Sequence, residues 1–166
     1  MNADYFRTLY DWRYWARDRV LTAAGDLTEE DYARPNGFTY GNVRGILTHT
    51  LGSEILWCAR VLGEMPRGLL TQEELPTVTA LRALWEEEER KMRAFLAQLT
   101  DQDVEKSVSF RGRDGNERVY PVWQLLTLVF HHTVQHRSEA AEALTAIGRS
   151  PGDMDFLVYL NRAASR

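Results

Sequence analysis

The chain has 166 residues, of which 44% are hydrophobic and 27% charged, a composition typical of a folded globular protein and not of a disordered one. A net charge of −4 argues against a nucleic-acid-binding protein, and a single cysteine, Cys58, excludes an intrachain disulfide. Charges interrupt every apolar run well short of the roughly 18 residues that a membrane span needs. We therefore expect one domain over residues 1–166, located in the cytoplasm, that binds neither nucleic acid nor a membrane.

The first half of the chain contains the patterns of two long helices and a short one. Over residues 3–24, apolar side chains recur at steps of three and four, which places them on one helix face. These side chains are Tyr5, Leu9, Trp12, Ala16 and Val20. A short helix is expected over 28–33, and a second long helix over 40–62 with Thr39 or Asn42 as its N-cap.

The second half predicts two more long helices with a hairpin between them. The third long helix is expected over 77–99. Residues 106–119 read as a small β-hairpin because alternating apolar residues flank an Asp-Gly turn signal. The fourth long helix is expected over 121–147, followed by a short helix over 154–164. Four long helices with varied connections predict an all-α fold, a four-helix bundle.

Two of the four histidines project from one face of the fourth long helix. His132 and His136 are four residues apart, so both can contact one ion. Their face is otherwise apolar, and consists of Leu125, Val129, Ala140, Ala143 and Ile147. His131 points about 100° away from His132 and is expected at the surface. Two imidazoles in an apolar interior need partners for their nitrogens, either hydrogen bonds or a metal ion.

His49 lies among apolar residues in the middle of the second long helix. A lone histidine in such a place is usually structural, but together with the pair it would complete a set of three. Three histidines leave a coordination position open, as in catalytic and not in closed structural metal sites. Cys58 and Glu54 are about 180° and 140° from His49 around that helix, so neither is expected as a ligand.

Two carboxylates are further candidates for a role in the interior. Glu139 is three residues after His136, on the flank of the histidine face, where it can bond a ligand histidine, accept a proton or simply be exposed. Glu88 falls within the apolar stripe of the third long helix. Glu88 either pairs with an arginine such as Arg13 or marks a hydrated gap between helices, and we favour the structural interpretation because a buried glutamate usually has a partner.

Three stretches of the chain resemble the DinB-like (DinB/YfiT) superfamily of metal-binding four-helix bundles. They are YGNVRGILTHTLGSEILW, FHHTVQHRSE and DMDFLVYL. The resemblance implies that His49, His132 and His136 bind a divalent metal such as nickel or zinc, and that the protein forms a homodimer. The chain departs from the family pattern after His136, where Arg137-Ser138-Glu139 stands in place of the common Arg-Gly-Gln.

Three hypotheses of function follow. Related members are S-transferases that use low-molecular-weight thiols, or presumed hydrolases, so the first is an enzyme that activates a thiol or water at an open three-histidine site. Its partners would be a small-molecule thiol or an electrophile, and Glu139 would be its catalytic residue. The second is a non-catalytic metal- or ligand-binding stress-response module, and the third is a dimerising bundle without a metal.

Overall fold

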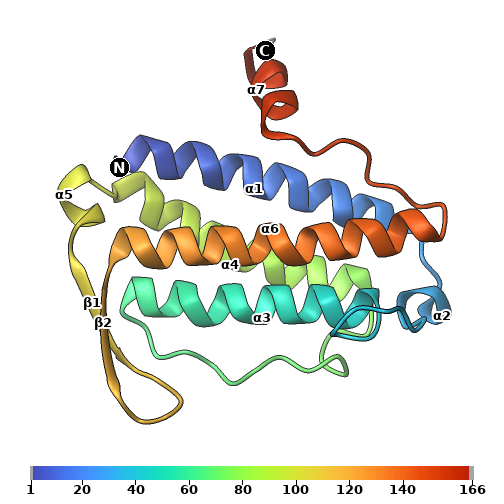
Figure 1. Ribbon diagram of the computed structural model, residues 1–166, viewed down its shortest axis with the longest axis horizontal. Coiled ribbons are helices and arrows are strands. Elements are labelled where there is room, and N and C mark those ends of the chain that lie inside the picture. Colours follow the sequence, from blue (N-terminus) through green and yellow to red (C-terminus); the bar gives the residue numbers. More distant parts are fainter. Residues whose placement is uncertain (1, 165–166) are drawn as a thin grey trace.

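The computed structural model describes residues 2–164, which form the expected all-α, four-helix bundle with a small hairpin and a short C-terminal helix (Figure 1). The long helices are α1 (Ala3–Ala24), α3 (Val43–Leu62), α4 (Val78–Gln98) and α6 (Val122–Ala146). The other elements are α2 (Glu29–Tyr32), α5 (Asp101–Val104), β1 (Ser107–Arg111), β2 (Glu117–Pro121) and α7 (Phe156–Ala164).

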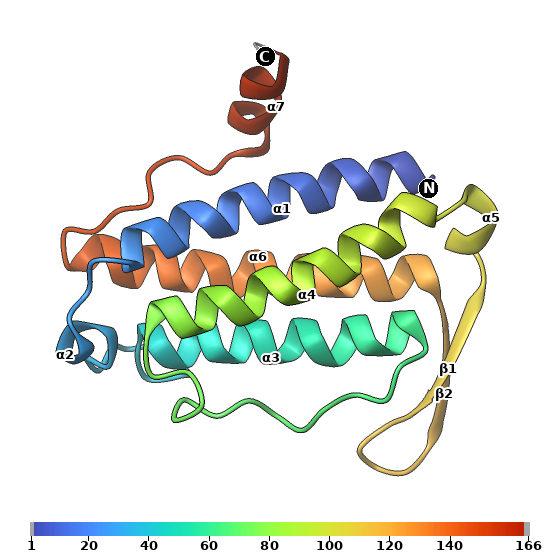
Figure 2. The same cartoon turned by 180° about the vertical axis from the view of Figure 1, so that it is seen from behind.

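The long helices form a square in which each packs against two neighbours. Helices α1 and α6 run in one direction and α3 and α4 in the other, as Figures 1 and 2 show from opposite sides. The connection over 63–77 therefore runs back along the length of the bundle. This order makes α3 and α6 antiparallel neighbours although they are far apart in the sequence.

Most element boundaries agree with the sequence-based prediction, and the differences have local causes. Helix α3 begins at Val43 and not at Tyr40, because the Asn42 side chain accepts a hydrogen bond from the backbone N–H of Gly45 at 2.7 Å. Helix α5 was not predicted; it starts with a capping box at Thr100. Tyr5, which the periodicity placed on the apolar face, is 49% exposed, and its neighbour Phe6 is buried in its place.

The interior consists of two apolar clusters with a polar layer between them. One cluster fills the end where α3 and α4 begin, and the other fills the end that the hairpin covers. The polar layer is centred on Glu54, whose carboxylate accepts hydrogen bonds from Trp85 Nε1 at 2.8 Å and Thr133 Oγ1 at 3.2 Å. Arg13 Nη2 lies 3.2 Å from the same carboxylate. One α3 side chain thus contacts α1, α4 and α6.

The expected pairing of Glu88 with Arg13 is wrong. Arg13 is buried against Glu54, with its guanidinium over the rings of Tyr10 and Tyr14 at 4.3 and 4.5 Å. Glu88 lies at the edge of the buried face of α4 and turns outward to Lys91, whose Nζ is 2.7 Å away. Periodicity located the Glu88 backbone near the interior, but the flexible side chain reaches the surface.

We predict that Glu54→Ala lowers the free energy of unfolding by about 3–5 kcal/mol, because it leaves the Arg13 charge buried without its partner. Glu88→Ala, which removes a carboxylate near the surface, is the matched control and should cost about 1 kcal/mol or less. Urea unfolding of both metal-free variants at neutral pH measures the difference. Equal losses would contradict the structural role given to Glu54.

Candidate metal centre

Three histidines meet where α3 and α6 lie side by side. His49 comes from α3, and His132 and His136 come from successive turns of α6. One ligand nitrogen from each lies within 4.8 Å of the others, and His49 Nε2 is 3.2 Å from His132 Nε2. The packing of two antiparallel helices therefore brings together residues that are 83 positions apart.

The geometry of this cluster fits a divalent metal ion. Zinc–nitrogen bonds of about 2.0–2.1 Å place the nitrogens of a tetrahedral site about 3.3 Å from one another. The separation between His49 and His132 is close to that spacing. The donor set, three imidazoles, suits zinc, nickel and similar ions and not magnesium or calcium.

The environment keeps these imidazoles in the neutral form that binds metals. Burial, reinforced by the neighbouring imidazoles of His136 and His132, lowers the pKa of His49 to about 4. Burial and His136 also lower the pKa of His132. At neutral pH, protons therefore compete little with a metal for these two residues.

Glu139 fixes the ring of His136. Its Oε2 atom is 2.7 Å from Nδ1 of His136, which leaves Nε2 as the nitrogen available to a metal. A carboxylate bonded to the far nitrogen of a ligand histidine sets the orientation of the ring and raises its basicity. Of the contacts considered for Glu139, the hydrogen bond with His136 is present.

Tyr40 covers the cluster and was not recognised in the sequence, because the helix was expected to start there. Its ring stacks on His49 with centroids 3.8 Å apart and meets the His136 ring edge-on at 5.2 Å. Gly45 permits this approach, since a Cβ atom at this position would lie 2.1 Å from the Tyr40 carbonyl oxygen. An aromatic residue just before the helix, followed by Gly41 and Gly45, was the available signal.

The residues expected to lie away from the cluster do so. His131 is exposed on α6. Cys58 is buried in an apolar cluster, where burial raises its pKa to about 12 and keeps it a thiol. Glu54 is held in the polar layer. A cavity of about 300 Å³, lined in part by Tyr40, His49 and Ser53, gives access to His49 from outside.

A helical bundle in which two adjacent helices bring three histidines together, one of them beside a cavity, defines a class of protein equipped to bind a divalent metal. The sequence model of the DinB family matches residues 1–166, and the chain belongs to the DinB family. The chain is also similar to Protein DinB of Bacillus subtilis (strain 168), with 22% identity over 165 residues that cover 95% of each protein. Among residues 2–164, no helix combines the length and apolar character needed to cross a membrane.

We expect the purified protein to carry about one divalent transition metal ion per chain. His49→Ala, His132→Ala and His136→Ala should each lose most of the metal, because two imidazoles bind far more weakly than three. His131→Ala, on the exposed side of the same helix, should retain it. Elemental analysis by mass spectrometry decides the matter, and metal loss in His131→Ala with retention in His132→Ala would refute the assignment.

Gly45→Ala should displace Tyr40 from His49, because the new Cβ atom would clash with the Tyr40 carbonyl oxygen. We expect the affinity for zinc to fall by about tenfold, the smallest loss typical when a residue that orients a metal ligand is removed. Gly52→Ala on the same helix is the control, since its Cβ would only make ordinary contact with Leu70 at 3.5 Å. Titration against a competing chelator gives both affinities. Wild-type affinity in Gly45→Ala would mean that Tyr40 does not support the site.

Proposed function

We propose that the protein is a metal-dependent enzyme that activates a thiol or water at an open site formed by His49, His132 and His136, with zinc or nickel as the metal. One observation carries the proposal: three imidazole nitrogens from two helices converge beside a cavity that reaches His49. A structural metal site needs no such access, whereas a reaction does.

The residues of the chain divide the work of such a site. A divalent ion held by neutral imidazoles supplies Lewis acidity, which lowers the pKa of a thiol or water bound to it. Tyr40 holds the His49 ring by stacking, and Glu139 holds the His136 ring by its hydrogen bond. Glu139 is partly exposed, so its carboxylate can also accept a proton at the edge of the site.

The proposal favours a thiol over water, and hence S-transfer to an electrophile over hydrolysis, on the resemblance to thiol-dependent family members alone. The alternative is a non-catalytic metal- or ligand-binding stress-response module. Incubating the zinc- or nickel-loaded protein with an electrophile and glutathione, bacillithiol or mycothiol separates the two. Thiol consumption that requires His132 supports the enzyme, and metal binding without turnover supports the module. The homodimer implied by the family stays a prediction.

Glu139→Gln should retain the metal but lower the turnover number by about a hundredfold and change the shape of its pH–rate profile, because the amide cannot accept a proton. Glu142→Gln, at an exposed position on the same helix, is the matched control. Metal content and pH–rate profiles of the three proteins test this. Metal loss in Glu139→Gln would make Glu139 a ligand, and an unchanged profile would remove it from the reaction.

A further inference from the structure

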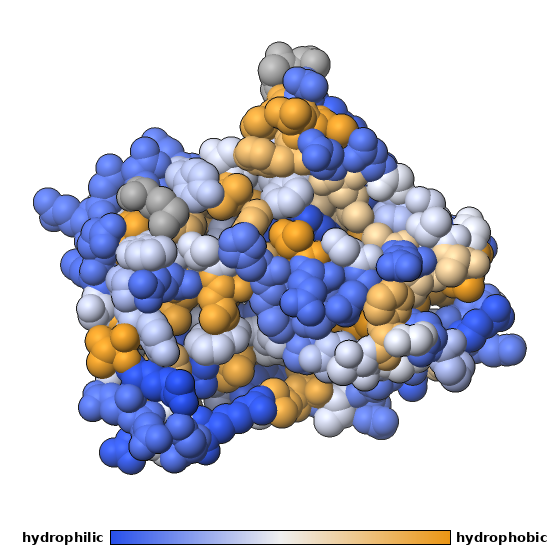
Figure 3. Space-filling view, in the orientation of Figure 1, coloured by the Kyte–Doolittle hydropathy of each residue, from blue (hydrophilic) through white to orange (hydrophobic). Residues whose placement is uncertain are grey.

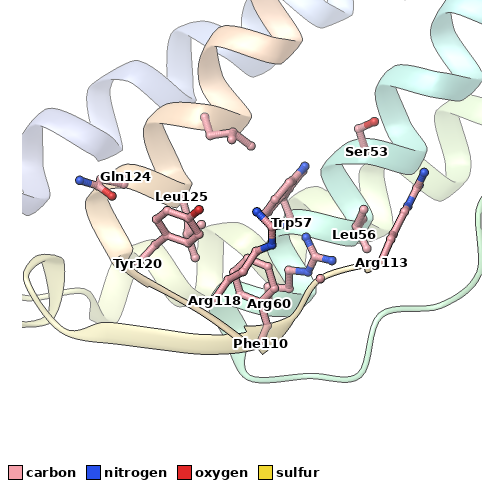
Figure 4. A pocket seen from close by; sticks show the side chains of 12 residues that line it. Ser53, Leu56, Trp57, Arg60, Phe110, Arg113, Arg118, Tyr120, Gln124 and Leu125 are labelled. Carbon is pink, nitrogen blue, oxygen red and sulfur yellow. The ribbon is translucent and has the colours of Figure 1, made fainter. Parts of the chain in front are cut away.

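A second cavity, of about 600 Å³, extends from Ser53 toward the hairpin. It lies between α3, the hairpin and the first turns of α6 (Figure 4). Ser53 lines both this cavity and the one that reaches His49, and its Oγ atom is 3.4 Å from His49 Nε2. On the opposite wall, Leu128 lies one helical turn before His132. The two cavities therefore share Ser53 as a lining residue and adjoin each other beside His49.

The far end of this cavity is positively charged. Arg60, Arg113 and Arg118 line it, and no aspartate or glutamate is among the described residues that do so. Figure 3 shows strongly hydrophilic side chains gathered over this hairpin end of the molecule. Arg118 forms an ion pair with Asp114 at 2.8 Å. The guanidinium of Arg60 instead lies over the rings of Trp57 and Phe110, at 4.3 and 4.2 Å from their centroids.

The charge on Arg60 is therefore partly buried, with no carboxylate among its described contacts. Burial, and then the repulsion of Arg113 and Arg118, lowers its pKa below the usual arginine value. An arginine stays protonated even so, and Asp114 already balances the charge of Arg118, so Arg60 and Arg113 repel each other without a carboxylate among their described contacts. An anion bound among them would remove this repulsion and form charge-assisted hydrogen bonds.

Aromatic rings form the remaining wall of the charged end. Phe110 meets Trp57 edge-on at 5.7 Å and stacks with Tyr120 at 6.0 Å (Figure 4). Gly112 keeps the turn compact, because a Cβ atom there would lie 2.6 Å from Nε of Arg118. A cavity of this volume with apolar walls and a few convergent charges is suited to a small organic molecule.

We propose that this cavity binds the anionic end, a carboxylate or a phosphate, of a small organic ligand whose other end reaches the histidine cluster. The second half of this statement rests on the proposed function, and the first half does not. Arg60 is eleven residues after His49 on the same helix, a rise of about 16 Å. The long arginine side chains shorten that distance, so the ligand would be extended, with its charged group and its reactive group at opposite ends.

The test is a fluorescence titration with dansyl-glutamate, which has two carboxylates, and with uncharged dansylamide. Wild-type protein should bind the anionic probe at least tenfold more tightly, and the double variant Arg60→Gln/Arg113→Gln should lose that preference. Arg149→Gln, which removes one charge at the opposite end of α6, should keep it. A wild-type protein without the preference, or a double variant that retains it with an unchanged melting temperature, overturns the proposal.

Two further arms separate this proposal from the metal assignment. His132→Ala should retain the preference for dansyl-glutamate, so a protein that binds no metal but still binds the anion contradicts only the proposed function. Competition with succinate and with inorganic phosphate then identifies whether carboxylate or phosphate is the better match. Displacement by either supports the arginine site, and displacement by neither contradicts it.

Discussion

The carboxylate of Glu54 is the constraint on which the arrangement of the four long helices depends. It accepts hydrogen bonds from Trp85 of α4 and Thr133 of α6 and pairs with the buried Arg13 of α1. One side chain of α3 therefore sets the axial position of α1, α4 and α6 relative to α3. A helix that slid by one turn would leave a buried charge unpaired, which costs several kcal/mol. On α6, Thr133 directly follows His132. On α3, Glu54 directly follows Ser53, whose Oγ atom lies 3.4 Å from Nε2 of His49. The register that satisfies the polar layer is therefore also the register that brings His49 to His132 and His136.

The features that could be predicted from the sequence depend on residues a few positions apart. The spacing of His132 and His136, the Asp114-Gly115 turn and the exposure of His131 follow from the geometry of one helix or one turn. The features that were missed depend on pairing between distant segments. Periodicity places Glu54 and Glu88 on a helix face but cannot say which of them meets Arg13. The stacking of Tyr40 on His49 likewise requires knowing how the chain enters α3.

The distribution of charge shows why the net charge of the chain does not predict the charge of an individual cavity. The chain carries a net charge of −4, yet three arginines from α3 and the hairpin converge on one cavity. In the adjacent histidine cluster, burial and the neighbouring imidazoles lower the pKa values of His49 and His132. A candidate metal centre and a cavity lined by three arginines thus lie next to each other, with Ser53 between them. Such a local difference in charge arises from the packing of segments that are far apart in the chain. A net charge summed over the whole sequence does not reveal it.

The hairpin packs against the bundle less extensively than any long helix does. It is a two-stranded sheet that contributes Phe110, Arg113 and Arg118 to the cavity and no side chain to the polar layer or to the histidine cluster. Its turn residues can change without exposing core surface or unpairing a buried charge. Substitutions in this one segment can thus reshape the arginine-lined cavity while the three histidines stay in place.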